Sequence, residues 1–300
     1  MKFMITPPYL LKGDEVGIVA PAKFIPQENY EQILKFIESK GLVPVRGKTT
    51  YLESGIFAGT DEERTQDLQQ MIDAPNLKAV FCLRGGYGTL RILDKLNFST
   101  FLKTPKWVIG FSDITVLHAA IANIDVESIH GQMPLNFAQS SKGLEVLFET
   151  LEGANLAYQL PIHLLNRIGA SEARLVGGNV AMICSLLGTP FAFQTQGNIL
   201  FIEEIGEHLY RFDRMLQHLK LAGALKNLAG LVVGGLTSME DQSPSFGKTS
   251  EEIVWDAVKN YDYPVCFGFP AGHIENNHPL IINRKVRFEV GRSEVKLQFS

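Results

Sequence analysis

Short apolar runs alternate along the first half of the chain with segments whose apolar residues recur at helical spacing. Runs that lack polar alternation are typical of strands buried on both faces of a sheet. The runs that we predict to be strands are EVGIVA (15–20), LVPV (42–45), KAVFCL (78–83), KWVIGF (106–111) and ESIHG (127–131). Because these strands alternate with helices, they predict a parallel sheet covered on both faces and joined by right-handed crossovers.

Start and stop signals place the helices between these strands. ENYEQILKFIESKG (28–41) is amphipathic and ends at Gly41, a residue typical of helix C-termini. Thr60 and Glu63 have the spacing of a capping box, which predicts a helix that runs to about residue 74. Helical patterns also follow the strands predicted at 78–83 and 106–111.

The second half of the chain is less regular. VGGNVAMICSLLG (176–188) indicates a glycine turn that leads into a helix, and NILFIEEIGE (198–207) indicates a strand that ends in carboxylates. Further strands are predicted within AGLVVGG (229–235) and PVCFGFPAGH (264–273). Residues 285–300 alternate between apolar and polar side chains, as in an antiparallel hairpin that turns around Gly291 and Arg292.

These patterns predict an α/β protein with two domains. The first, residues 1–165, is a three-layer α/β domain around a parallel sheet. The second, residues 166–300, is a smaller, β-rich domain with a mixed sheet. A length of 300 residues is compatible with two such domains.

Composition and charge exclude several classes of protein. With 45% hydrophobic and 20% charged residues, the chain has the composition of an ordinary globular protein. A net charge of -4 gives no overall attraction to nucleic acid or to anionic membranes. No apolar run reaches the roughly 18 residues of a membrane span, and Pro7 and Pro8 interrupt the apolar stretch near the N-terminus. We therefore expect a cytoplasmic protein that binds neither nucleic acid nor membrane.

Cysteine and histidine spacing predicts neither disulfides nor a metal site. Cys82, Cys184 and Cys266 are odd in number, far apart and inside apolar runs, as reduced buried thiols are. His273 and His278 are close in sequence but lack a third ligand. We expect no metal and no cofactor.

Unusual residues follow the predicted strands at their carboxyl ends, where parallel α/β proteins bind ligands. RGGYG (84–88) follows the third strand, Ser112 the fourth, and HGQMP (130–134) the fifth. Ser112 has two interpretations: it is an N-cap of the next helix, or a nucleophile held on a tight turn. The stretch KWVIGFSDITVLHAA (106–120) by itself favours the cap.

Two residues of the second half change this balance. Glu203 ends a predicted strand, beside Glu204, and is either a solvent-exposed carboxylate or one poised over a cleft. His273 follows the turn-forming run FGFPAG and is either structural or catalytic. Ser112, Glu203 and His273, in this chain order, match the layout of the catalytic residues of a serine hydrolase. The site differs from an α/β-hydrolase elbow, because Ile114 stands where GxSxG requires glycine.

Gly85 and Gly86 complete this set of candidates. Their backbone N–H groups are suited to an oxyanion or to a phosphate, and a plain turn is the third interpretation. RGGYG is not a GxGxxG motif, and there is no Walker sequence, which weighs against a nucleotide site.

The chain resembles the LD-carboxypeptidase family of serine peptidases, which includes murein tetrapeptide carboxypeptidases and microcin C self-immunity proteins. The resemblance covers nearly the whole chain, and its stretches follow the order of the family. They are GDEVGIVAPA (13–22), LRGGYGTLRILDKL (83–96), VIGFSDITVLHAA (108–120), HGQMP (130–134), LVGGNVAMICSLLGTPF (175–191), LFIEEIGEHLYRFDRML (200–216) and FGFPAGHIENNHPL (267–280).

The resemblance implies catalytic roles for particular residues. It implies a triad of Ser112, Glu203 and His273, and an oxyanion hole formed by the backbone N–H groups of Gly86 and Asp113. It also implies an α/β N-terminal domain, a smaller β-rich C-terminal domain and assembly into a homodimer.

Two positions depart from the pattern of the family. Gln132 stands where proline is common, and Asn283 stands where glycine is frequent. Neither is a triad position, but both lie where the resemblance allows the specificity for the end of the substrate to be set.

The expected function is that of a serine carboxypeptidase that hydrolyses the LD-peptide bond to the terminal D-Ala of murein tetrapeptides during cell-wall recycling. Its partner is then a small peptide, with Arg84 and Gly85 as candidates for substrate binding and Arg84 as one possible cation for the terminal carboxylate.

Two other functions stay open. One is a microcin C-type self-immunity peptidase that cleaves peptidyl-nucleotide conjugates, for which Phe246 in the polar segment 237–252 is the available stacking aromatic. The other is a non-catalytic ligand-binding module, in which RGGYG holds a phosphate and Ser112 is a cap.

Overall fold

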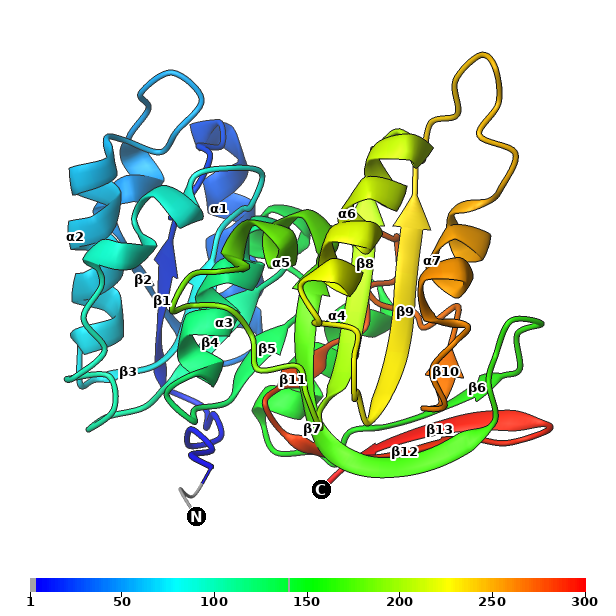
Figure 1. The fold of residues 1–300 in the computed structure, drawn as a ribbon. Coiled ribbons are helices and arrows are strands. Elements are labelled where there is room, and N and C mark those ends of the chain that lie inside the picture. Colours follow the sequence, from blue (N-terminus) through cyan, green and yellow to red (C-terminus); the bar gives the residue numbers. More distant parts are fainter. Residues whose placement is uncertain (1–3, 140) are drawn as a thin grey trace. The chain divides into compact units, whose positions relative to one another are not determined.

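The computed structural model describes residues 4–139 and 141–300. The chain forms two compact units (Figure 1). The N-terminal unit contains the chain up to Ala154 together with His278–Ile281, and the C-terminal unit contains Asn155–Asn277 and Ile282–Ser300. The domain boundary predicted between residues 165 and 166 stays a prediction.

The N-terminal unit is built on a six-stranded sheet in the order β11-β5-β4-β3-β1-β2. Its strands are β1 (Glu15–Val19), β2 (Val43–Arg46), β3 (Leu77–Cys82), β4 (Trp107–Gly110), β5 (Ser128–His130) and β11 (Leu280–Ile282). The pairs β1/β2, β1/β3, β3/β4 and β4/β5 are all parallel. The parallel sheet predicted from the five apolar runs is therefore confirmed, and β11 adds an edge strand from far along the chain.

Helices cover both faces of this sheet. They are α1 (Tyr30–Ser39), α2 (Asp61–Asp73), α3 (Thr115–Ala122) and α4 (Lys142–Leu151). A side chain on Gly17 of β1 would meet Met71 of α2, whereas the ring of Phe81 in β3 stacks on Phe148 of α4. Because Gly17 is in register with Val80, the neighbour of Phe81, the two contacts lie on opposite faces. The predicted three layers are confirmed.

Local signals at the helix ends are confirmed in one case and wrong in another. Thr60 and Glu63 form the predicted capping box at the start of α2. After β3, however, the expected α-helix is replaced by two short 3₁₀ helices, η3 (Thr89–Arg91) and η4 (Leu93–Lys95). Tertiary contacts override the helical pattern there. Thr89 N–H donates to the Asp113 carboxylate, and the Arg91 guanidinium pairs with Asp61 of α2.

The C-terminal unit is built on a seven-stranded sheet in the order β10-β9-β8-β7-β12-β13-β6. Its strands are β6 (Ala157–Pro161), β7 (Gly169–Asn179), β8 (Ile199–Ile205), β9 (Gly230–Thr237), β10 (Val265–Cys266), β12 (Lys285–Val290) and β13 (Glu294–Phe299). β7 to β10 pair in parallel, and β7, β12, β13 and β6 pair antiparallel. The predicted mixed sheet is confirmed, and so is the hairpin at the end of the chain.

Helices α5 (Val180–Leu186), α6 (Leu209–Leu221) and α7 (Ser250–Val258) complete the C-terminal unit. The glycine turn predicted at the start of 176–188 is wrong, because Gly177 and Gly178 pair with Phe201 and Ile202 inside β7. The Asn179 side chain then accepts a hydrogen bond from Met182 N–H, so that α5 begins directly at the end of the strand.

The predicted strand within 264–273 is also shorter than expected. Only Val265 and Cys266 pair with β9, and the chain then leaves the sheet through Gly268, at φ 72°. All three cysteines are free thiols, and Cys82 and Cys266 are buried. No helix within residues 4–139 and 141–300 combines the length and apolar character needed to cross a membrane.

Candidate active site

Ser112 occupies a strained corner between β4 and α3. Its φ is 64°, in the left-handed region that non-glycine residues rarely adopt and that is frequent at functional sites. The short helix η5 (Ser112–Ile114) begins there, with Phe111 at its N-cap position and no side-chain capping hydrogen bond. The interpretation of Ser112 as a cap is therefore wrong: the residue is half-buried, and its hydroxyl caps no helix.

The residues around Ser112 explain how the corner is made. A Cβ on Gly110, two residues before the serine, would lie 2.8 Å from the Ile114 side chain, so Ile114 fills the space over this glycine. Gly85 approaches from the neighbouring strand end. A Cβ at Gly85 would lie 3.3 Å from both Ser112 Cβ and Asp113 N. The RGGYG loop and the serine turn are thus in direct contact within the N-terminal unit.

The Asp113 carboxylate and the Arg64 guanidinium hold the RGGYG loop in place. Asp113 Oδ2 accepts a hydrogen bond from Thr89 N–H at 2.9 Å, and burial raises the pKa of this carboxyl while the hydrogen bonds from Thr89 oppose the shift. The fully buried Arg64 donates to the carbonyls of Pro21, at 2.6 Å, and Gly88, at 2.8 Å. Asp113 and Arg64 therefore fix the carboxyl end of the loop, and Arg64 also ties it to Pro21.

Two backbone donors remain available beside the serine. Neither Gly86 N–H nor Asp113 N–H donates a hydrogen bond to another residue in the described part of the N-terminal unit. Gly86 has φ 102°, a conformation that disfavours any side chain. Free N–H groups beside a serine hydroxyl are what an oxyanion hole requires.

Glu203 and His273 form a pair in the C-terminal unit. His273 Nδ1 lies 2.7 Å from Glu203 Oε2, and His273 N–H donates to the same oxygen at 3.3 Å. The Glu203 side chain is fully buried, whereas the His273 side chain is 18% exposed. A buried carboxylate that accepts from Nδ1–H fixes the tautomer in which Nε2 carries no proton. Such a pair has the geometry that a general base requires.

A bulge in β9 brings the histidine to the carboxylate. Between the pairs Ile202↔Val233 and Glu204↔Leu236, two glycines of β9, Gly234 and Gly235, face the single residue Glu203 of β8. Gly235 N–H leaves the ladder and donates to Ala271 O at 2.9 Å, which draws the loop before His273 over the strand end. Bulges of this kind are frequent next to active sites.

Two more contacts fix the loop of His273. Asn277, which is buried, accepts a hydrogen bond from Gly272 N–H at 2.8 Å through Oδ1, and the Thr237 hydroxyl donates to His273 O at 3.0 Å. Sequence reasoning missed Asn277, Arg64 and the bulge. The doubled glycine in AGLVVGG was the only local signal for any of them.

Glu204 points away from Glu203 and has a structural role. Its Oε1 accepts from Asn179 Nδ2 at 2.8 Å and from Ile205 N–H at 2.9 Å, and its Oε2 accepts from Ala181 N–H at 2.8 Å. Burial raises the pKa of this carboxyl, and these hydrogen bonds oppose the shift. Glu204 thus fixes the junction between β7 and α5.

The other residues singled out from the sequence lie as follows. Asn283 has φ 73°, which explains why asparagine replaces the more frequent glycine, since asparagine tolerates this conformation best among side-chain-bearing residues. Gln132 is buried, and its Oε1 accepts from Asn136 Nδ2 at 3.5 Å. Phe246 is half-buried in the loop between β9 and α7.

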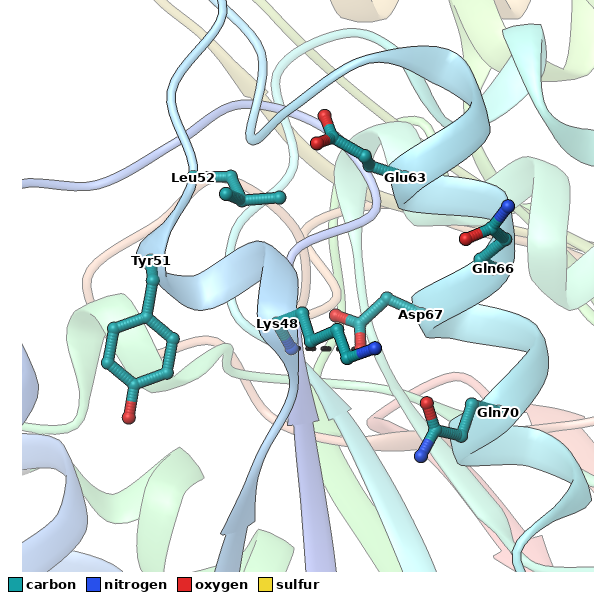
Figure 2. Close-up of a pocket in the computed structure, with 7 residues that line it drawn as sticks. All are labelled: Lys48, Tyr51, Leu52, Glu63, Gln66, Asp67 and Gln70. Carbon is teal, nitrogen blue, oxygen red and sulfur yellow. Dashed lines mark hydrogen bonds between the residues drawn. The ribbon is translucent and has the colours of Figure 1, made fainter.

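A pocket of about 520 Å³ opens elsewhere in the N-terminal unit, between α2 and the short helix η2 (Lys48–Tyr51) (Figure 2). It is lined by Lys48, Tyr51, Leu52, Glu63, Gln66, Asp67 and Gln70. The Asp67 carboxylate already accepts hydrogen bonds from Lys48 N–H, Thr49 N–H and the Thr49 hydroxyl. None of the predicted site residues lines this pocket, so it does not change the assignment.

A strained serine turn and a buried carboxylate–histidine pair, both on parallel α/β frameworks, are the groups of a serine hydrolase. The family model of the LD-carboxypeptidase N-terminal domain matches residues 16–131, and that of the LD-carboxypeptidase C-terminal domain matches residues 172–288. The chain belongs to the LD-carboxypeptidase family of serine-type hydrolases.

Individual relatives agree with this membership. The probable murein peptide carboxypeptidase of Bacillus subtilis is 36% identical over 281 residues, which cover 89% of this chain and 86% of that protein. The murein tetrapeptide carboxypeptidase of Pseudomonas aeruginosa is 28% identical, over 87% of this chain and 89% of that protein. The microcin C7 self-immunity protein MccF of Escherichia coli is 22% identical, over 91% of this chain and 88% of that protein.

A solved structure shows the same two-domain fold. The muramoyltetrapeptide carboxypeptidase from Oxalobacter formigenes superposes with a TM-score of 0.87 at 27% sequence identity, over 95% of this chain and 98% of that one. The α/β fold with an N-terminal parallel sheet and a C-terminal mixed sheet is therefore shared with a carboxypeptidase of known structure.

Proposed function

We propose that this protein is a serine carboxypeptidase that hydrolyses the LD-peptide bond before the terminal D-Ala of murein tetrapeptides. The observation that carries the proposal is Ser112, a serine at φ 64° whose hydroxyl caps no helix. A non-glycine residue in this conformation costs about 1–3 kcal/mol, and residues strained in this way cluster at active sites.

In this proposal Ser112 is the nucleophile, His273 the general base and Glu203 the residue that orients the base. Ser112 Oγ attacks the scissile carbonyl while His273 Nε2 takes its proton, and Glu203 stabilises the imidazolium that forms. His273 then protonates the leaving amine of D-Ala. Water, deprotonated by the same nitrogen, hydrolyses the ester to Ser112 and restores the enzyme. The mechanism requires Ser112 Oγ to come within hydrogen-bond reach of His273 Nε2.

The N–H groups of Gly86 and Asp113 are the proposed oxyanion donors. Both belong to the N-terminal unit, as Ser112 does, and both are free of other hydrogen bonds among its described residues. A donor of this kind is typically worth about 2.7–4 kcal/mol in the transition state. The contact of Gly85 with Ser112 Cβ and Asp113 N supports the placement of the two donors on one side of the serine.

Murein tetrapeptides are favoured as substrates by the relatives. The proteins named for murein peptides are 36% and 28% identical, whereas the self-immunity protein is 22% identical. Hydrolysis of a peptidyl-nucleotide conjugate is therefore the second candidate, and Phe246 is the aromatic side chain that its nucleobase would need.

The test is release of D-Ala from a synthetic tetrapeptide, followed by mass spectrometry. Matched peptides with LD- and DL-linked ends report the stereochemistry, and an aminoacyl sulfamoyl adenosine reports the second candidate. We expect D-Ala from the LD-linked peptide alone. Cleavage of the nucleoside conjugate without release of D-Ala would replace the murein assignment by the second candidate.

Variants test the triad itself. We expect Ser112→Ala and His273→Ala each to abolish turnover and labelling by a fluorophosphonate, while Ser99→Ala and His218→Ala, at exposed positions, leave both intact. Because triad members act as a unit, the double variant Ser112→Ala/His273→Ala should be little worse than either single one. Additive losses would contradict the triad.

A further inference from the structure

A carboxypeptidase must recognise the free carboxylate at the end of its substrate. An assignment of the cation that binds this carboxylate rests on the proposed function. Charge-assisted hydrogen bonds to an ammonium or guanidinium group are the usual solution. The sequence points to Arg84 as a candidate. In the structure, Arg84 Nη1 donates to Phe24 O at 3.2 Å, so its guanidinium ties the RGGYG loop to the segment after β1.

A second cation, Lys23, lies against Gly86, one of the two proposed oxyanion donors. The stem of Lys23 runs across the α-carbon of Gly86: a Cβ at Gly86 would lie 2.8 Å from Lys23 Cδ and 3.1 Å from Lys23 Cε. A side chain at position 86 would have to displace this stem. The Lys23 ammonium is one bond beyond Cε, and therefore stays next to the N–H group proposed to bind the oxyanion.

The backbone of Lys23 is held firmly in this place. Lys23 forms an isolated bridge with Phe57, and the flanking hydrogen bonds are Ala58 N–H to Ala22 O at 3.0 Å and Phe24 N–H to Ile56 O at 3.4 Å. The Arg64 guanidinium fixes Pro21, two residues earlier, through its carbonyl. The stem is half-buried, so the ammonium starts from a restricted position.

Among the described residues of the N-terminal unit, the ammonium of Lys23 has no counter-ion. Within the described residues of the N-terminal unit, its Nζ makes neither a hydrogen bond nor an ion pair. The Asp113 carboxylate is buried and accepts from Thr89 N–H. A restricted cation that lacks a partner, beside two free N–H donors, is suited to an anionic ligand.

We propose that Lys23 binds the terminal carboxylate of the substrate and thereby sets the exopeptidase specificity. The geometry fits the length of one residue. Gly85 contacts Ser112, Gly86 contacts Lys23, and the two glycines are adjacent. In the substrate, the terminal carboxylate follows the scissile carbonyl by one residue, a span of about 3.3–3.6 Å.

The test compares one tetrapeptide in its acid form and in its C-terminal amide form. For the wild-type protein we expect kcat/KM to be about 10- to 150-fold higher for the acid, the range of a charge-assisted hydrogen bond. Lys23→Met keeps the packing of the stem but removes the charge. It should lower kcat/KM for the acid by that factor, leave the amide unchanged, and so bring the ratio close to one.

Controls separate charge from structure. Lys23→Arg should keep most of the acid preference, and Lys103→Met, at an exposed lysine, should keep all of it. Arg84→Met should lower both substrates together, because Arg84 positions the loop. The rate of fluorophosphonate labelling, a reaction without a carboxylate, should be equal in wild type and Lys23→Met.

Each failure has its own meaning. If the wild type releases D-Ala with an acid preference that Lys23→Met retains, the assignment of Lys23 is wrong and the proposed function stands. If the wild type cleaves acid and amide equally, or neither, the carboxypeptidase assignment fails. In that case the Kd of Ser112→Ala for the acid peptide, with and without Lys23→Met, still tests Lys23: an unchanged Kd overturns the proposal.

Discussion

Gly272 lies directly against Glu203, so that a Cβ at residue 272 would sit 2.8 Å from Glu203 Cβ and 2.9 Å from Oε2. The φ of Gly272 is 114°. The close approach lets the next residue, His273, place both its N–H and its Nδ1 on one carboxylate oxygen. The orientation of His273, the proposed base, therefore depends on residue 272 being a glycine, which has no side chain.

Gly272→Ala should consequently impair catalysis more than folding. The methyl group displaces Glu203 or the histidine loop, and a misplacement of about 1 Å costs on the order of 100-fold in rate. Steady-state kinetics give kcat/KM, and urea unfolding gives stability. The matched control is Gly188→Ala, at φ 78° with no atom near its Cβ position. Equal losses of activity in the two variants would show that backbone strain, rather than the contact with Glu203, is responsible.

Glu203→Gln should lower kcat by about 10³–10⁴-fold while the protein still folds. The amide is nearly isosteric, but it neither enforces the tautomer of His273 nor stabilises the imidazolium. Single-turnover kinetics measure the acylation step directly. Glu204→Gln is the internal comparison: it should lower the free energy of unfolding and leave kcat near the wild-type value. A reversal of these two effects would exchange the roles of the two carboxylates.

Gly85→Ala probes the oxyanion side of the site. The new methyl group would lie 3.3 Å from both Asp113 N and Ser112 Cβ, tight enough to obstruct the donor. Because loss of an oxyanion donor costs about 10²–10³-fold in kcat, we expect a decrease approaching that range. Thermal unfolding should change little, since Gly85 does not have a positive φ. An unchanged kcat would place the oxyanion elsewhere.

His118 of α3 should make the stability of the protein sensitive to acid. Burial lowers the pKa of His118 from 6.5 to about 4, and the neutral ring fits its partners, Gly110 O and the Ser128 hydroxyl. Between these two pH values the unfolded chain binds the proton and the folded one does not. The contribution of His118 to the free energy of unfolding is therefore fully present above about pH 6.5 and falls by about 3 kcal/mol towards pH 4.

The variant His118→Gln isolates this contribution from the carboxylates that titrate in the same range. The difference in free energy of unfolding between wild type and variant, measured by urea titration, should shrink by about 3 kcal/mol from pH 7 to pH 4. A difference that does not depend on pH would mean that His118 keeps an ordinary pKa in the folded protein.

Local sequence signals predicted what depends on neighbours in the chain. The apolar runs became β1 to β5, and the Thr60–Glu63 spacing became a capping box. The rule that ligands gather at the carboxyl ends of parallel strands selected Ser112 and the glycine pair. These signals succeed because strand burial and helix capping are decided within a few residues.

Features that depend on distant partners escaped prediction. Arg64 lies in DEER, a stretch that predicts an exposed helical turn. In the structure it is completely buried and donates hydrogen bonds to the carbonyls of Pro21 and Gly88. The bulge opposite Glu203 exists because Gly235 bonds Ala271 rather than its ladder partner. The partners of Arg64 and of Gly235 lie far from them in the sequence, so the local periodicity of polar and apolar residues does not predict these contacts.

Because of strand β11, cleavage of the chain between the two units would not by itself separate the fragments. This strand is the outer neighbour of β5 (Figure 1). It is synthesised only after most of the C-terminal unit, and its three residues are fully buried. A protease that cleaves at the exposed Ala154–Asn155 linker would leave two fragments joined by a shared sheet. Made alone, the first fragment would present β5 as an open, adhesive edge. An exchange of the two halves between relatives would therefore also exchange the edge strand of the first sheet.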